Sequence, residues 1–182
     1  MSGHRSTVSI VLVVMIVGSA SVSAQGRGMA GMGPTHDSAT AAQMRVIHEL
    51  VVNNDRISRT VTNLPNGIRT VTESSDPRLA RLIKEHVVTM DARVRAGSDP
   101  GLPMESAALH AIFLGKDRIT TSIDTTARGI VIVQTSADSA LVVALQQHAA
   151  DVTDLVKRGM AAMHDAMMKN NPAMGGGRRG PP

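Results

Sequence analysis

Apolar residues recur at helical spacing in four stretches of this chain, and β-branched residues dominate four short stretches between them. The longer stretches predict amphipathic helices at 40–54, 77–96, 104–114 and 139–168. The shorter stretches predict strands at 57–62, 68–73, 119–124 and 130–135. A turn at Leu64-Pro65-Asn66-Gly67 joins the first two strands into a hairpin. The order of elements is therefore helix–strand–strand–helix, and it occurs twice.

The second half of this pattern repeats the first. The stretch from His48 to Gly97 returns without a gap as His110 to Gly159, an offset of 62 residues, and 13 of the 50 aligned positions are identical. A match of this length with the same element order predicts an internal duplication. One hairpin alone is marginal in water, whereas two can form a four-stranded antiparallel sheet. We therefore predict an α+β fold of two tandem α-β-β-α repeats, with helices covering the sheet and pseudo-two-fold symmetry.

Capping residues mark the ends of the predicted long helices. Asp76 and Asp138 stand at corresponding helix starts, where a carboxylate accepts hydrogen bonds from free backbone amides. Gly97 is placed to end the first long helix, because glycine adopts the left-handed backbone of a C-terminal cap. An acid–base dipeptide, predicted to form a salt bridge or a turn cap, recurs at the helix–strand corner of each half as Asp55-Arg56 and Asp117-Arg118.

Residues 1–24 have the pattern of a cleavable secretory signal peptide. His4 and Arg5 form a short positive region, Ile10 to Val17 is apolar, and small residues lead to a cleavage site after Ala24. The apolar run is shorter than the roughly 20 residues that a membrane-spanning helix needs. We therefore expect a soluble mature protein, periplasmic or secreted, that does not associate with a membrane after cleavage.

The two ends of the mature chain differ in composition from the domain between them. Residues 25–39 are rich in glycine and methionine, which predicts a flexible arm. Residues 40–168 form a single duplicated domain, with repeats at 40–97 and 104–159 and a last helix that extends to about 168. Residues 169–182 are rich in glycine and proline, which predicts a disordered tail.

Composition excludes several classes of site. The chain has no cysteine, which excludes disulfides, thiolate metal sites and covalently attached c-type haem. Phe113 is its only aromatic residue, so the core must be aliphatic and nucleic-acid bases have no stacking platform. The net charge of +4 includes basic residues at the termini rather than one dense cluster, which also argues against nucleic-acid binding.

One histidine lies on the apolar face of each long helix, His86 in the first half and His148 in the second. A buried imidazole without a hydrogen-bond partner costs about 1–3 kcal/mol, so each ring needs a partner. Two alternatives follow. Either the rings converge and ligate a metal ion or a haem iron, or each ring bonds a backbone carbonyl and packs in the core.

Other histidines and methionines add weaker candidate ligands. Thioether and imidazole groups without thiolate suit copper in an oxidising compartment. The predicted arm carries Met29, Met32 and His36. Within the domain the weaker candidates are His48, His110, Met90, Met160, Met163 and His164. The methionines of the last helix also fit the alternative of core filling, because their flexible side chains occupy irregular gaps.

The sequence thus favours an exported, non-catalytic protein that binds a metal ion or small ligand. Copper is favoured over haem, because haem pockets usually have aromatic walls. The alternative is a structural or protein-interaction module of the bacterial envelope, with core histidines and a protein partner or a homodimer. A hydrolase is the weakest class, because the chain contains no nucleophile elbow, phosphate-binding loop or HExxH motif.

Two runs of residues resemble a group of exported bacterial proteins of unknown function. Thr70 to Pro77 (TVTESSDP) leads to His86, and Thr135 to Asp138 (TSAD) leads to His148. Proteins of this group carry a tandem helix–hairpin–helix repeat, and the similarity covers residues from about 44 to 164. The resemblance implies this fold and an exported location, and it implies no particular activity. The group's pattern has a histidine before the repeated corner aspartate, where this chain has Asn54 and Lys116.

Overall fold

Four antiparallel strands form one sheet in the order β1-β2-β4-β3, so the two hairpins join through their second strands. The strands are β1 Ser58–Leu64, β2 Gly67–Glu73, β3 Ile119–Thr125 and β4 Gly129–Ser136. This computed structural model describes residues 38–170. The predicted signal peptide, all but the last residues of the predicted arm, and the tail from residue 171 lie outside the described residues.

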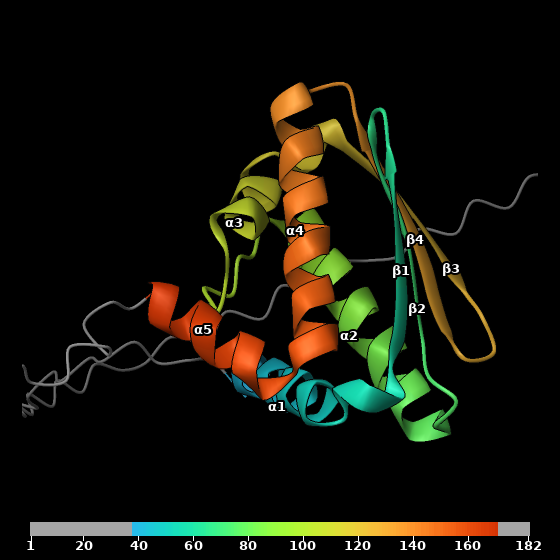
Figure 1. The fold of residues 1–182 in the computed structure, drawn as a ribbon. Coiled ribbons are helices and arrows are strands. Elements are labelled where there is room, and N and C mark those ends of the chain that lie inside the picture. Colours follow the sequence, from blue (N-terminus) through green and yellow to red (C-terminus); the bar gives the residue numbers. More distant parts are fainter. Residues whose placement is uncertain (1–37, 171–182) are drawn as a thin grey trace, which may run out of the picture. The chain divides into compact units, whose positions relative to one another are not determined.

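The α-helices of residues 38–170 all lie on one side of the sheet, as Figure 1 shows. They are α1 Ser38–Val52, α2 Pro77–Ala96, α3 Ala107–Leu114, α4 Ser139–Arg158 and α5 Met160–Asn170, with single 3-10 turns η1 Asn54–Arg56 and η2 Lys116–Arg118. The long helices cross between the halves, because α2 packs against β4 and α4 against β1 and β2. None of these helices combines the length and apolar character that crossing a bilayer requires. The predicted α+β fold class is confirmed, whereas the duplication stays a prediction.

Side chains alternate across the sheet, because successive residues of a strand point to opposite faces. On β2, Ile68, Thr70 and Thr72 are buried beneath the helices, and Arg69 and Val71 lie on the other face. The face toward the helices therefore contributes to the core, and the opposite face has no helix of the described chain upon it (Figure 1).

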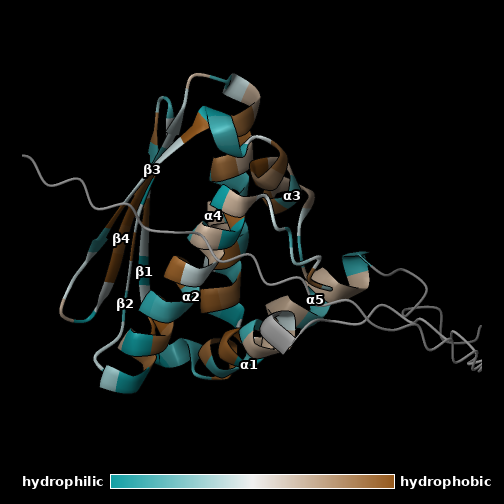
Figure 2. Ribbon diagram, turned by 180° about the vertical axis from the view of Figure 1, so that it is seen from behind, coloured by the Kyte–Doolittle hydropathy of each residue, from teal (hydrophilic) through white to brown (hydrophobic). Residues whose placement is uncertain are grey.

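The core between sheet and helices is aliphatic, as the composition requires. Leu145 and Ala149 on α4 have no exposed surface, and they pack with Ile68, Ile112 and Ala144. Figure 2 shows that α3 and β4 are largely hydrophobic, while the outer surfaces of α2 and α4 carry hydrophilic residues. Burial of these aliphatic side chains supplies the main stabilisation of the fold, at about 1.5–3 kcal/mol for each fully buried Leu or Ile.

The predicted capping and corner residues make matching contacts in the two halves. Asp76 Oδ1 accepts from the Arg78 amide at 2.7 Å, and Gly97 ends α2 with a φ of 65°. Arg56 pairs with Asp76, and Arg118 with Asp138. Each corner arginine thus binds the cap of the following helix, rather than the aspartate beside it in sequence. The Oγ atoms of Ser74 and Ser136 each donate to a corner carbonyl at 2.7 Å.

The predicted single last helix is wrong, because the chain breaks at Gly159 into α4 and α5. Gly159 has a φ of 57° and a ψ of −131°, a conformation that glycine alone adopts without strain. A Cβ at this position would lie 2.5 Å from Asn54 Oδ1, so no larger residue fits. The break turns α5 away from the axis of α4.

Two other helix bounds differ from expectation. The third helix begins at Ala107 rather than 104, because Ser106 Oγ accepts from the Leu109 amide at 3.3 Å and caps it there. The last helix continues to Asn170, where the side chain is held by carbonyl groups of the loop before α3. Both differences concern the loop of residues 97–106, between α2 and α3.

Candidate functional site

Three side chains that could share a metal ion meet where the α2–α3 loop enters α3: Asp99 and Glu105 in the loop, and His110 on the first turn of α3. One ligand atom from each lies within 4.8 Å of the other two, and no second such group occurs within residues 38–170. The His110 Nδ1 atom is 2.8 Å from Asp99 Oδ2. Both carboxyl side chains are half-buried, whereas His110 is exposed.

Backbone hydrogen bonds set the positions of the two carboxyl groups. Asp99 Oδ1 accepts from the Gly101 amide at 2.9 Å, which closes a tight turn at the start of the loop. Glu105 Oε2 accepts from the Leu102 amide at 3.1 Å. The loop therefore folds back on itself, and Asp99 Oδ2 faces His110 on the first turn of α3.

The end of α5 closes against this loop. Asn170 Nδ2 donates to the carbonyl oxygens of Pro103 at 3.2 Å and Glu105 at 2.6 Å. Asn170, the two carboxyl groups and His110 line an open surface pocket of about 660 Å³. This space admits a hydrated ion or a small molecule from solvent.

The two carboxyl groups differ in proton affinity. Burial, a hydrogen bond to Asp99 and the negative charge of Asp99 raise the pKa of Glu105 to about 7. Burial acts to raise the pKa of Asp99 too, but hydrogen bonds from the Gly101 amide, His110 and Glu105 hold that pKa below its usual range. Glu105 therefore carries the proton of the pair near neutral pH, and Asp99 is the anion.

His86 on α2 and His148 on α4, the leading candidates from the sequence, are half-buried residues whose rings are largely surrounded by protein. His86 Nδ1 is 3.1 Å from Gln43 Oε1 on α1. The pKa of each ring is lowered to about 4, chiefly by burial. For His148 the charges of Arg59 and His86 contribute to this lowering of the pKa, so the two rings lie within electrostatic reach of one another. Both are neutral at pH 7.

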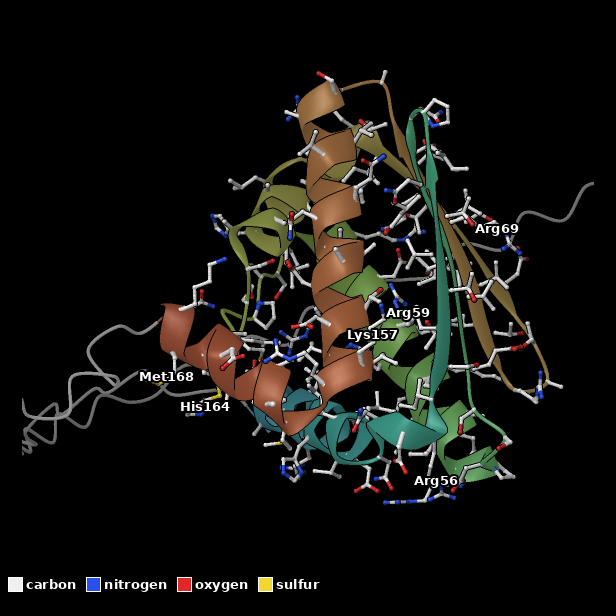
Figure 3. All side chains as sticks on the ribbon, viewed as in Figure 1. Arg56, Arg59, Arg69, Lys157, His164 and Met168 are labelled. Atoms are coloured by element: carbon white, nitrogen blue, oxygen red, sulfur yellow. The ribbon has the colours of Figure 1, made fainter. Side chains whose placement is uncertain are left out.

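A buried cation lies beside this pair. Figure 3 shows Arg59 extending from β1 into the space between sheet and helices. Its Nη1 donates to Thr72 Oγ1 at 2.6 Å, whereas its buried Nε has no hydrogen-bond partner within residues 38–170. Burial lowers the pKa of Arg59 to about 10, which still leaves it charged at pH 7. Asp151, which acts to raise the pKa of His148, has a buried and unpartnered Oδ2.

This environment disfavours a metal ion at the interior histidines. A guanidinium charge in a medium of low dielectric constant repels a second cation, and Arg59 acts in that way on protonation of His148. Asp151 offsets part of this repulsion. His86 already has Gln43 as a partner, which is the hydrogen bond that the packing alternative requires, made with a side chain in place of a backbone carbonyl.

The weaker candidates from the sequence are dispersed. His48 and Met160 are exposed on different helices, Met90 is half-buried on α2, and Met163 is buried in the core. His164 is exposed on α5, where Figure 3 shows it on the same side as Met168. The candidates Met29, Met32 and His36 lie outside the described residues.

Sequence reasoning missed Asp99 and Glu105 as ligands. It left Asp99 between two predicted helices and placed Glu105 within the helix predicted at 104–114, and it named only His110 of the three. The available signal was two acids on either side of a Pro-Gly turn, followed by a histidine. A spacing of five residues between Glu105 and His110 does not place them on one helix face. Only the folded loop brings these groups together.

No protein-family model, curated protein or solved structure matches this chain. Its function is therefore argued from the chemistry of the two polar clusters. One imidazole and two carboxyl groups at an open pocket are ligands that divalent transition metals accept. The interior cluster, with a cation beside the rings and Gln43 already bonded to His86, suits a structural role.

Proposed function

We propose that this chain is an exported protein that binds a divalent transition-metal ion through Asp99, Glu105 and His110. The observation that supports this proposal is the proximity of the three ligand atoms, all within 4.8 Å of one another. Oxygen and nitrogen ligands of this kind are those that Zn²⁺ and Cu²⁺ accept in proteins. The signal-peptide pattern of residues 1–24 supports export.

The openness of the pocket favours reversible binding. Structural zinc sites are closed by four protein ligands, whereas sites with three protein ligands keep a position for water or substrate. Here the three ligands face solvent through a pocket of about 660 Å³. We therefore expect an ion that exchanges with solution and with other ligands, as in a metal carrier or reservoir, rather than one locked in the fold.

Copper remains the metal that the sequence favours, and its ligands change in this proposal. The sequence assigned it to His86 and His148, with methionines in support. The Asp99–Glu105–His110 cluster contains no thioether, so it suits Cu²⁺ rather than Cu⁺. Zn²⁺ is the sharper probe, because it does not favour thioether ligands and the Met-rich arm does not compete for it.

A metal titration tests the proposal. The chain is expressed with its own leader, purified, stripped with a chelator, and titrated with Zn²⁺ and then Cu²⁺ by isothermal calorimetry. We expect one Zn²⁺ per chain, and a loss of more than about 100-fold in affinity for His110→Ala and for Asp99→Asn, because loss of an outer-shell partner alone costs about 10–100-fold.

His48→Ala is the matched control. His48 stands 62 residues before His110, at the corresponding position of the first half, and it is exposed like His110. It should bind Zn²⁺ as the unmodified chain does. Unchanged affinity in His110→Ala and Asp99→Asn would contradict the proposal. Affinity lost only in the His86→Ala, His148→Ala double variant would return the metal to the interior.

A second candidate function is the non-catalytic interaction module. It is favoured by the hydrogen bond between His86 and Gln43, because a partnered interior histidine needs no ligand to explain it. The two candidates differ in a simple measurement. The interaction module takes up no metal after chelation, and its His110→Ala variant has the stability and metal content of the unmodified chain.

A further inference from the structure

One face of the sheet is left without a helix by the described chain. Figures 1 and 2 show, from opposite sides, that every helix of residues 38–170 packs on the other face. Alternation along the strands places Arg69 and Val71 of β2 on this open face. The register then assigns their neighbours on β4, because Val71 pairs with Val131 and Arg69 pairs with Val133.

The middle of the open face is apolar. Val71, Val131 and Val133 are adjacent on the two central strands and are only half-buried. Small polar side chains border them on the outer strands and at one end of β4. They are Ser58, Thr60 and Thr62 on β1, Thr135 on β4, and Thr120 and Ser122 on β3. A patch of three valines with a polar rim is the anatomy of a small protein interface.

Two exposed and opposite charges flank the valines. Arg69 lies on β2 beside Val133, and Figure 3 shows it on the side of the sheet away from the helices. Asp124 lies on β3 beside Val131, on the opposite flank. Within residues 38–170, neither forms a hydrogen bond or an ion pair. The third charge of this face, Glu73, is already bonded to Thr126 at 2.9 Å.

The register makes this arrangement complementary to itself. Arg69 and Asp124 are two strands apart and offset by two residues, a separation of about 12 Å. The midpoint between them falls on β4, between Val131 and Val133. A two-fold axis through that point, between two facing sheets, stacks the valines of both copies. It also places each Arg69 opposite Asp124 of the partner subunit.

We propose that the open face is a homodimer interface, in which the valines of two copies pack together between two reciprocal Arg69–Asp124 ion pairs. An isologous interface has this property, since residue i of one copy contacts j of the other and j contacts i. A second copy fits this face better than an unrelated partner does. The charges of Arg69 and Asp124 are opposite in sign and lie symmetrically about the apolar centre, so each can pair with the other residue of a second copy.

The size of the face sets the strength of the contact. Four strands of about seven residues cover roughly 20 by 23 Å. This area lies below the roughly 800 Å² per partner of a standard interface, so the dimer should be weak and concentration-dependent. The proposal is independent of metal binding, because the α2–α3 loop that carries Asp99 and Glu105 is on the helical side of the molecule (Figure 1).

Sedimentation equilibrium over about 1–500 µM chain tests the proposal, with circular dichroism to verify folding. The unmodified chain should pass from monomer to dimer in this range, which is the weak class expected for so small an interface. Arg69→Asp and Asp124→Arg should each weaken association about ten-fold or more, since each places like charges opposite one another. The double variant restores both pairs with reversed polarity and should regain the affinity of the unmodified chain.

Arg81→Asp is the matched control, because Arg81 is an exposed arginine on α2, on the helical side. It should dimerise like the unmodified chain. A chain that stays monomeric at every concentration would overturn the proposal. So would a double variant as weak as the single ones, because charge reversal then acts without the Arg69–Asp124 pairing. Dimerisation lost equally in Arg81→Asp would place the interface elsewhere and overturn it too.

Discussion

Acid should destabilise this protein through its two interior histidines. Burial lowers the pKa of His86 and His148 to about 4 from the ordinary value of 6.5 that applies in the unfolded chain. Between these values the unfolded chain binds more protons than the folded one. The free energy of unfolding therefore falls as the pH drops from 6.5 to 4, and these two groups change it no further below about 4.

The size of the effect follows from linkage. At pH 5 an unfolded histidine is almost fully protonated while the buried ring is still neutral. This difference lowers the free energy of unfolding by about 2 kcal/mol per histidine relative to pH 7. The pair then costs about 4 kcal/mol, a large part of the 5–15 kcal/mol that stabilises a typical domain. The charged groups that face the pair, Arg59 and Asp151, act on His148 in opposite directions.

Glu105 has the opposite effect on the pH dependence of the free energy of unfolding. Its pKa is raised to about 7 in the folded chain, so its contribution to stability improves as the pH falls from 7 toward 4.5. A single pH profile would mix the two effects. Comparison of variants at the same two pH values removes the Glu105 contribution, because it is common to all of them.

Urea unfolding followed by far-ultraviolet circular dichroism, at pH 7 and pH 5, is the suitable assay, since the chain has no Trp or Tyr to report by fluorescence. Between pH 7 and pH 5 the free energy of unfolding of His148→Gln should fall by about 2 kcal/mol less than that of the unmodified chain. His48→Gln should lose as much as the unmodified chain, because His48 is exposed. Equal losses in the unmodified chain and in His148→Gln would refute a buried, neutral ring at position 148.

Two further predictions concern folding stability and are measured by urea unfolding at pH 7. Leu145→Ala should cost about 2–5 kcal/mol, since Leu145 has no exposed surface and its removal leaves a cavity. Leu114→Ala, at a position that is 75% exposed, should cost less than about 1 kcal/mol. Gly159→Ala combines a positive φ with a Cβ 2.5 Å from a side-chain oxygen, and it should cost more than Gly101→Ala. Gly101 has a φ of 57°, and a Cβ added there would meet no atom of residues 38–170 within 4 Å, so its substitution carries only the backbone strain of about 1–2 kcal/mol. Equal costs at the two glycines would contradict the contact with Asn54.

Local features of this fold were predictable from the sequence. Asp76 and Gly97 cap α2 as expected, because a cap depends on hydrogen bonds to amides and carbonyls only a few residues away. The hairpin turn at Pro65 and Asn66 lies between β1 and β2 as expected, for the same reason. The alternation of β2 could be read as well, since every second side chain points to the same face.

The helix break at Gly159 could not be read from periodicity, because apolar positions continue through it. The contact that requires glycine is with Asn54, a residue more than 100 positions earlier. The cluster at Asp99 depended likewise on a loop closed by backbone hydrogen bonds, and on Asn170 reaching that loop from α5. Such contacts join residues that no local pattern relates.

The sequence alone determined the order of helices and strands up to the last helix, the aliphatic core and the α+β class, because periodicity and the near absence of aromatic residues act residue by residue. Only the tertiary structure decided which polar groups meet. It placed a half-buried cation, Arg59, beside His148, and it gathered Asp99, Glu105 and His110 at one pocket. It also left Arg69 and Asp124 on an open face, without a partner among residues 38–170. Burial, charge and hydrogen bonding between distant residues exist only after the chain has folded, and they decide the chemistry of this protein.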